Sequence, residues 1–270
     1  MRIVSYSSER ESRAGILSDG EVFDAGASMR ELLAGGGLAG IEPAGEGRAL
    51  DEVELLPPIP DPDKIVCLGL NYRAHAAEAG LEPPDSPTIF AKYRNALAAP
   101  GATVRLPDTS DKVDYEAEVA FVIGRRAKDV AEQDALGHVA GYMLLNDLSA
   151  RDLQFATPQW MPGKVFDGSA PCGPALVTPD EAGPHDAIEF SLTLNGEQMQ
   201  AASTDDLVFS VPAIVSRLSA LMTLEPGDVI STGTPSGVGS MREPRVWLQP
   251  GDAIVIESPT LGRLETTISG

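Results

Sequence analysis

The stretch that decides the fold runs from Val113 to Gly124 and reads VDYEAEVAFVIG. Side chains on a strand alternate between two faces, and one face of this segment is apolar or aromatic throughout. The other face carries Asp114, Glu116 and Glu118 first and then becomes apolar. A solvated face would stay polar along its length, so the pattern predicts that the two glutamates lie side by side at the edge of a buried surface.

Neighbouring carboxylates that are partly buried repel each other and are costly to remove from water. A bound cation would relieve both penalties, and oxygen-only ligands suit Mg²⁺, Mn²⁺ or Ca²⁺ better than zinc. Asp147 comes shortly after the apolar segment 139–145 and supplies a third carboxylate. Two other interpretations stay open from these residues alone: an exposed acidic strand edge for Glu116 and Glu118, and a helix N-cap for Asp147.

Strand signals dominate the chain after residue 60. The pair Asn195-Gly196 favours a tight hairpin turn within residues 188–199. Further strands are expected at 65–68, 113–123, 139–145, 228–232, 253–257 and 263–268, with helices at 71–79 and 211–222. Many strands and few long helices predict an α+β, mainly β fold, and the regular βα alternation of a Rossmann fold is missing.

A domain boundary is predicted where four prolines crowd into residues 57–62, since none of them fits inside a helix or a central strand. Before it, short strands are expected at 2–6, 15–17 and 22–23, with a short helix at 29–33. Residues 1–59 are therefore expected to form a small β-rich accessory domain, and residues 60–270 the main domain.

The composition narrows the class of protein. The chain has 270 residues, 43% of them hydrophobic, so it can bury a sizeable core. It lacks an apolar run of the roughly 18 residues that a membrane helix needs, and its first residues lack a signal peptide's apolar segment, so a cytoplasmic location is expected. The net charge of −20 argues against nucleic acid and anionic membranes as partners. Two cysteines make neither a disulfide framework nor a zinc motif.

Two further segments carry candidate catalytic side chains. His75 and Glu78 stand three residues apart, which places them on one face of the expected helix. A carboxylate that accepts from one imidazole nitrogen raises the basicity of the other, as a general base requires. Lys164 follows a glycine and could hold a substrate carboxylate or enolate. A surface His–Glu pair and a surface loop lysine are the alternatives.

The loop Thr232–Gly239, TGTPSGVG, follows an apolar strand, and its glycines permit close approach of the backbone to a ligand. It lacks the Gly-Lys-Ser/Thr ending of a nucleotide-binding P-loop, which argues against a nucleotide site.

Taken together in chain order, these segments resemble the fumarylacetoacetate hydrolase family. The resemblance rests on GLNYRAH at 69–75, DYEAE at 114–118, NDLSARDLQ at 146–154, GKVFD at 163–167, TGTPSGVG at 232–239 and LQPGD at 248–252. It implies a mixed β-sandwich roll, a homodimer, and Mg²⁺ or Mn²⁺ as cofactor, with Ca²⁺ possible in crystals.

The resemblance also implies roles for single residues. It assigns catalysis to His75, Glu78 and Lys164, substrate binding to Gln154, Thr234 and Arg73, and metal binding to Glu116, Glu118 and Asp147. The segment that carries His75 is expected to close as a lid.

Members of this family cleave, decarboxylate or isomerise small oxo-acids. The leading expectation is hydrolytic C–C cleavage of a β-diketo acid, as in acylpyruvate hydrolases, through a metal-stabilised enolate. An isomerase of the 2-hydroxyhepta-2,4-diene-1,7-dioate type and an oxaloacetate-type decarboxylase are the alternatives. A third alternative, a binding protein that kept the metal fold, is disfavoured because the chain retains all the expected ligands and the catalytic side chains.

Overall fold

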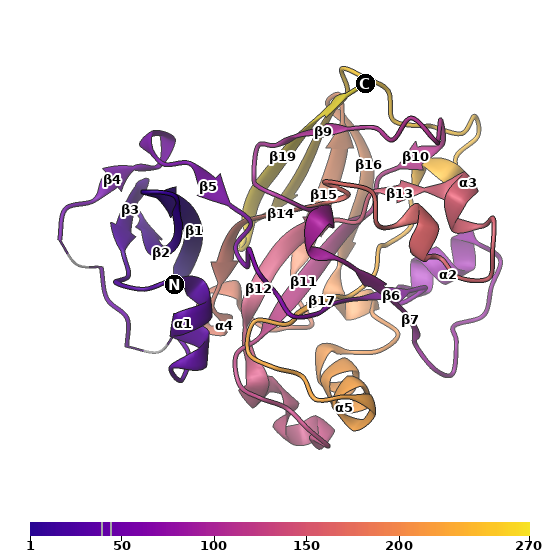
Figure 1. The fold of residues 1–270 in the computed structure, drawn as a ribbon. Helices are drawn as coiled ribbons and strands as arrows, with labels where there is room; N and C mark the ends of the chain where they lie inside the picture. The colour runs from indigo at the N-terminus through magenta and orange to yellow at the C-terminus, as the bar shows by residue number, and fades with distance from the viewer. Residues whose placement is uncertain (39, 44) are drawn as a thin grey trace.

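The computed structural model describes residues 1–38, 40–43 and 45–270, which form mostly β-strands (Figure 1). The strands are β1 Arg2–Ser8, β2 Glu11–Ser18, β3 Glu21–Asp24, β4 Arg48–Ala49, β5 Leu55–Leu56, β6 Ile65–Gly69, β7 Thr88–Lys92, β8 Leu97–Ala98, β9 Thr103–Arg105, β10 Val113–Asp114, β11 Ala117–Ile123, β12 Val139–Asn146, β13 Ser149–Ala150, β14 Ala170–Val177, β15 Glu189–Leu194, β16 Glu197–Ser203, β17 Val229–Ser231, β18 Ala253–Ser258 and β19 Gly262–Ser269. The helices are α1 Met29–Ala34, α2 Arg73–Glu78, α3 Arg151–Gln154, α4 Pro179–Ala182 and α5 Val211–Leu221. The predicted α+β, mainly β class is confirmed.

Two sheets make up the body of the protein. The larger has the order β4-β3-β2-β1-β14-β12-β11-β17-β6-β7, and the smaller has the order β16-β15-β18-β19-β9. The main core lies between them and under α5, because buried residues from β11, β15, β18 and α5 belong to one hydrophobic cluster. The fold is therefore a layered β-structure with β11 and β12 at its centre.

Strand β11 is buried on both faces, which explains why its sequence turns apolar on both. Val119 and Phe121 pack into the core between the sheets, whereas Ala120 and Val122 pack into a second core on the opposite face. Burial of both faces is typical of a strand in the middle of a sheet that is covered on both sides.

The long strand expected over 113–123 is wrong in one respect, because it is interrupted after Asp114. At the break, the Glu116 amide donates to the side-chain oxygen of Asn146 at 3.0 Å, and the Ala117 amide donates to Gln200 at 2.9 Å. These long-range side-chain partners replace a strand neighbour, so the backbone can leave the ladder without burying unsatisfied donors. The break, at residues 115 and 116, lies between Asp114 and Glu118 and includes Glu116.

The N-terminal segment extends the larger sheet. Its strands β1–β5 form the indigo and violet lobe in Figure 1, and β1 pairs antiparallel with β14, with Arg2 opposite Val177. Met29 and Leu33 of α1 share the second core with Val229. The helix begins at a capping box in which Ser28 and Glu31 satisfy each other's backbone donors.

Across the described ranges, no helix is both long enough and apolar enough to cross a membrane.

Candidate active site

Three buried carboxylates meet where two central strands end. Glu116 directly precedes β11 and Glu118 is its second residue, while Asp147 directly follows β12, whose Asn146 pairs with Ala117. Each carboxylate offers an oxygen, and these oxygens lie within 4.8 Å of one another. The side chains are at most 7% exposed, so the exposed-edge interpretation of the two glutamates is wrong.

Asp147 does not cap a helix. The N-cap of α3 is Ala150, which makes no side-chain cap hydrogen bond, and Asp147 is fully buried three residues earlier. Its two oxygens instead accept from two lysines: Lys92 at 2.7 Å and Lys164 at 2.6 Å. The N-cap interpretation is therefore wrong, and the side chain belongs to the carboxylate cluster.

Two of the three carboxylates are balanced by cations from the protein itself. Lys164 also donates to Glu116 at 2.6 Å, and Arg151 lies 2.7 Å from the other oxygen of Glu116. Burial alone would raise the pKa of Glu116, but Arg151 and Lys164 hold it below its ordinary value. Glu116 is therefore ionised in spite of its burial.

Glu118 is different. It accepts from the Ser231 hydroxyl and from the Gly233 amide, but no cation of the described residues lies within ion-pair distance of it. Burial, followed by repulsion from Asp147 and Glu116, raises the pKa of Glu118. A carboxylate in this position gains from a further positive charge.

The donor set fits a divalent cation. Glu116, Glu118 and Asp147 supply only oxygen ligands, which Mg²⁺ and Mn²⁺ prefer, and they leave Glu118 without a balancing charge. Four carboxylates, counting Asp114, face three cations in this cluster, so a divalent ion would change its net formal charge from −1 to about +1.

His75 and Glu78 form the pair that their spacing predicted. The Nδ1 atom of His75 lies 3.0 Å from Glu78 Oε2, while Glu78 Oε1 accepts from the Gly237 amide at 2.8 Å. Gly237 has a φ of +100°, and a Cβ there would lie 2.2 Å from the Met199 carbonyl oxygen, so the loop needs glycine at this point. The carboxylate thus ties the histidine helix to the Thr232–Gly239 loop, and the Nε2 atom of His75 has no hydrogen-bond partner among the described residues.

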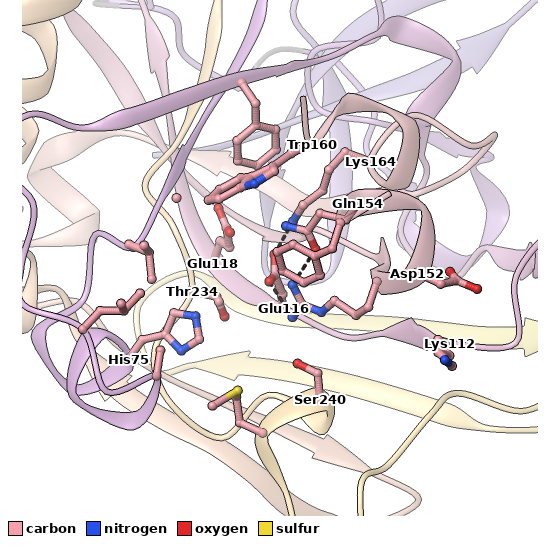
Figure 2. Close-up of a pocket in the computed structure, with 18 of the residues that line it drawn as sticks. His75, Lys112, Glu116, Glu118, Asp152, Gln154, Trp160, Lys164, Thr234 and Ser240 are labelled. Carbon is pink, nitrogen blue, oxygen red and sulfur yellow. Dashed lines mark hydrogen bonds and ion pairs between the residues drawn. The ribbon is translucent and has the colours of Figure 1, made fainter. Parts of the chain in front are cut away.

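A single cavity of about 480 Å³ joins these groups. His75, Glu116, Glu118 and Lys164 line it, together with Trp160 (Figure 2). The volume is in the range of small-molecule sites. Lys164 is only 1% exposed, so the surface-lysine interpretation is wrong. Burial would lower its pKa, but Asp147 and Glu116 raise it, which keeps the amine protonated.

Three residues are expected to contact substrate, and two of them, Gln154 and Thr234, line the cavity. The Thr234 hydroxyl donates to the Ala117 carbonyl at 3.0 Å and accepts from Gln200 at 2.9 Å. Arg73 does not line the cavity: it is exposed, and its guanidinium lies 3.4 Å from the Asp205 carbonyl oxygen.

Sequence reasoning missed two buried cations around the carboxylates, Lys92 and Arg151, and with them the partner of Asp114. Lys92 holds Asp147, and Arg151 bridges Asp114 and Glu116 while donating to Gln154 at 3.0 Å. Asp114 also accepts from the amide of Gly239, the last residue of the glycine loop, at 2.8 Å and from the amide of Ser240 at 3.0 Å. Lys92 and Arg151 stand in segments with an ordinary mixture of charges, so no local signal marked them. Alternation along the strand marked Asp114, but not its partner.

Two family models and a curated protein match this chain. Residues 64–269 match the family model described as fumarylacetoacetate (FAA) hydrolase C-terminal, and residues 1–58 match the model described as Rv2993c-like, N-terminal. Among curated proteins, the mitochondrial oxaloacetate tautomerase fahd2 of Xenopus laevis is 41% identical over 218 residues, which cover 80% of this chain and 68% of the relative.

Two solved structures from mycobacteria match the whole chain. A putative HpcE protein from Mycobacterium smegmatis is 34% identical with a TM-score of 0.89, and the match covers 100% of this chain and 99% of the other. A probable 2-hydroxyhepta-2,4-diene-1,7-dioate isomerase from Mycobacterium abscessus is 36% identical with a TM-score of 0.85, and the match covers 100% and 98%. The chain belongs to the fumarylacetoacetate hydrolase family.

Proposed function

We propose that the protein is a divalent-metal-dependent enzyme that moves a proton on the carbon next to the keto group of a small 2-oxo acid. The reaction would interconvert keto and enol tautomers or double-bond isomers. The observation that carries the proposal is the shared cavity, which is lined by two carboxylates of the buried cluster, Glu116 and Glu118, by the buried Lys164, and by a histidine held by a glutamate.

Glu116, Glu118 and Asp147 would hold the metal. When bound, the divalent cation supplies a concentrated positive charge for the carboxylate and keto oxygens of a 2-oxo acid, which favours the enolate form. The protein's own contribution is to hold these three ligands in place: Lys92 binds Asp147, Arg151 binds Glu116, and the Ser231 hydroxyl donates to Glu118.

Lys164 would bind the developing negative charge on the keto oxygen. An ammonium group has three donors, and Lys164 uses two of them on Glu116 and Asp147. Because Lys164 lines the cavity, its third donor is available to the substrate. A fixed donor of this kind stabilises charge as it forms, without reorganising.

His75 would accept the proton. Glu78 fixes the imidazole through Nδ1 and stabilises the charge that the ring gains, while Nε2 faces the substrate. The apolar side chains of Leu68, Phe90 and Trp160 line the same cavity and exclude water from the reacting carbon. Proton return to a different atom from the same histidine completes an isomerisation.

Hydrolysis is the second candidate, and it was the leading expectation from the sequence. The observation in its favour is that the free Nε2 atom of His75 is equally suited to deprotonating a water held in the cavity. The names of the relatives above, a tautomerase and a probable isomerase, support placing it second.

Product identification separates the two. The purified chain would be incubated with Mg²⁺ and, in turn, oxaloacetate, acetylpyruvate and 2-hydroxyhepta-2,4-diene-1,7-dioate. The enol absorbance and the proton NMR spectrum would be followed in ²H₂O. We expect tautomer or isomer exchange with deuterium uptake and an intact carbon chain. Release of acetate and pyruvate from acetylpyruvate would favour hydrolysis, and no turnover of any substrate would overturn both.

The homodimer, the cytoplasmic location and the division into domains at residues 59 and 60 stay predictions. Sedimentation of the purified protein tests the first, and expression of residues 60–270 alone tests the third.

A further inference from the structure

Four cationic side chains line the cavity, and they fall into two pairs. Arg151 and Lys164, the inner pair, are buried and bound to carboxylates of the site. Lys112 and Arg245, the outer pair, are exposed. Within the part of the chain that the structure describes, the side chains of the outer pair make neither an ion pair nor a hydrogen bond. The outer pair is therefore available to a ligand.

The outer pair occupies one wall of the cavity. The Leu248 amide donates to the Val113 carbonyl at 2.9 Å, and the Val246 amide donates to the Gly239 carbonyl at 3.0 Å. These bonds bring the segment that carries Arg245 beside the segment that carries Lys112. Figure 2 shows Lys112 on the side of the cavity away from His75.

The charge of this wall is opposite in sign to the net charge of the chain. Acidic residues outnumber basic ones by 40 to 20, yet Lys112 and Arg245 have no carboxylate partner among the described residues. Asp152 lines the same wall, but Ser110 and the Leu153 amide hold its Oδ1 atom at 2.5 and 2.9 Å, and it forms no ion pair with Lys112 or Arg245. The wall thus presents positive charge to the cavity against the field of the protein.

We propose that Lys112 and Arg245 bind a second carboxylate at the far end of the substrate, so that the enzyme prefers 2-oxo dicarboxylates to 2-oxo monocarboxylates. The inference rests on the proposed function, because it places the oxo-acid end at Glu116, Glu118 and Asp147. The guanidinium of Arg245 suits bidentate binding of a carboxylate, and the ammonium of Lys112 adds a mobile point charge. The cavity of about 480 Å³ leaves room for a carbon chain between the two ends.

A matched pair of probes tests the assignment without depending on turnover. Both 2-oxoadipate and 2-oxohexanoate have six carbons and the same oxo-acid end, and they differ only in a carboxylate or a methyl group at the far end. Binding of each to the Mg²⁺-loaded full chain would be measured by calorimetry. We expect 2-oxoadipate to bind about tenfold more tightly to the wild type, the size of a charge-assisted hydrogen bond.

The double variant Lys112→Gln with Arg245→Gln should reduce that ratio to about one by weakening 2-oxoadipate alone. The control, Arg10→Gln with Arg125→Gln, removes two positive charges from exposed side chains outside this cavity and should keep the ratio.

Equal binding of the two probes to the wild type, or an unchanged ratio in the double variant, overturns the assignment of Lys112 and Arg245. Failure of both probes to bind the Mg²⁺-loaded wild type overturns the proposed oxo-acid site itself. The two failures are therefore distinguishable.

Discussion

The floor and the lid of the cavity are built differently. The floor is the cluster of Glu116, Glu118, Asp147 and Lys164, whose side chains are at most 7% exposed. We call helix α2 the lid, because the sequence predicts that this segment closes over the cavity; its His75 and Glu78 are 13% and 23% exposed. The floor is tied by many short polar contacts, whereas the lid is pinned by single bonds such as Glu78 to the Gly237 amide.

This difference suggests that the floor and the lid have different functions. A rigid, buried floor suits the holding of charge, because fixed dipoles and charges act strongly where water is excluded. A lightly held helix suits a group that must meet the substrate after it binds. Floor variants should therefore change metal binding, and lid variants should change the rate with metal binding intact.

The largest effect is expected at the floor. Glu118→Gln keeps the shape of the side chain but removes its charge, so the metal site loses an anionic ligand. We expect metal affinity to fall at least about 100-fold and turnover to fall to background. Equilibrium dialysis with Mn²⁺ and a turnover assay measure both. Glu9→Gln, on the exposed surface, is the matched control. Wild-type metal binding by Glu118→Gln would remove Glu118 from the ligand set.

The lid comes next. His75→Ala removes the proposed base, and turnover should fall by about 10² to 10⁴, while the Mn²⁺ dissociation constant stays within about twofold, since His75 is not among the proposed ligands. Glu78→Gln keeps an acceptor for the Gly237 amide and should cost less than Glu78→Ala. If His75→Ala instead lost the metal, the separation of floor and lid would be wrong.

A smaller effect is expected at Lys92, which binds Asp147 of the floor. Lys92→Met removes the partner of Asp147 Oδ1 but leaves Lys164 on the other oxygen. The free energy of unfolding should fall by about 1–3 kcal/mol, because a buried acceptor loses its donor. Saturating Mg²⁺ should restore part of this loss by binding only the folded state. Thermal unfolding with and without Mg²⁺ measures it. Lys92→Arg, which keeps the charge, is the control, and equal losses in both variants would point to packing rather than charge.

The smallest effect is expected far from both regions, in the N-terminal strands. The Arg13 guanidinium, together with the Tyr6 hydroxyl and the Gly26 amide, holds the pKa of Asp24 below its ordinary value. A lowered folded pKa stabilises the protein above the ordinary aspartate range, and this contribution is lost progressively as the pH falls from that range through the lowered pKa. Asp24 is 41% exposed, so Asp24→Asn should cost less than about 1 kcal/mol at neutral pH. Denaturant unfolding at pH 7 and pH 3 measures this cost, and a cost that grows at pH 3 would contradict the sign.

The sequence predicted what local patterns encode. Alternation along 113–123 placed two glutamates together, the Asn195-Gly196 pair marked a turn that the structure contains between β15 and β16, and a spacing of three joined His75 to Glu78. Patterns cannot show partners that are distant in the chain. The break in the strand depends on Asn146 and Gln200, and the balance of charge on the floor depends on Lys92 and Arg151.

The sequence indicated the burial of the two glutamates but could not exclude exposure for them, for Asp147 or for Lys164. A Glu-x-Glu pair, an Asp before a helix and a lysine in a loop are each most often at the surface, and only the packing of β11 and β12 in the middle of the sheet buries all three. The order of the motifs along the chain carried the information that single residues lacked.

Manganese-induced broadening of the histidine NMR signals tests the central claim most directly. The chain has three histidines. His138 directly precedes β12 and Asp147 directly follows it, so the eight-residue strand separates them by roughly 26 Å. With less than one equivalent of Mn²⁺, we predict that the ring signals of His75 broaden first, and that Glu118→Gln abolishes this. Broadening of His138 or His185 ahead of His75, or no broadening at all, would contradict a metal held by the floor within reach of the lid.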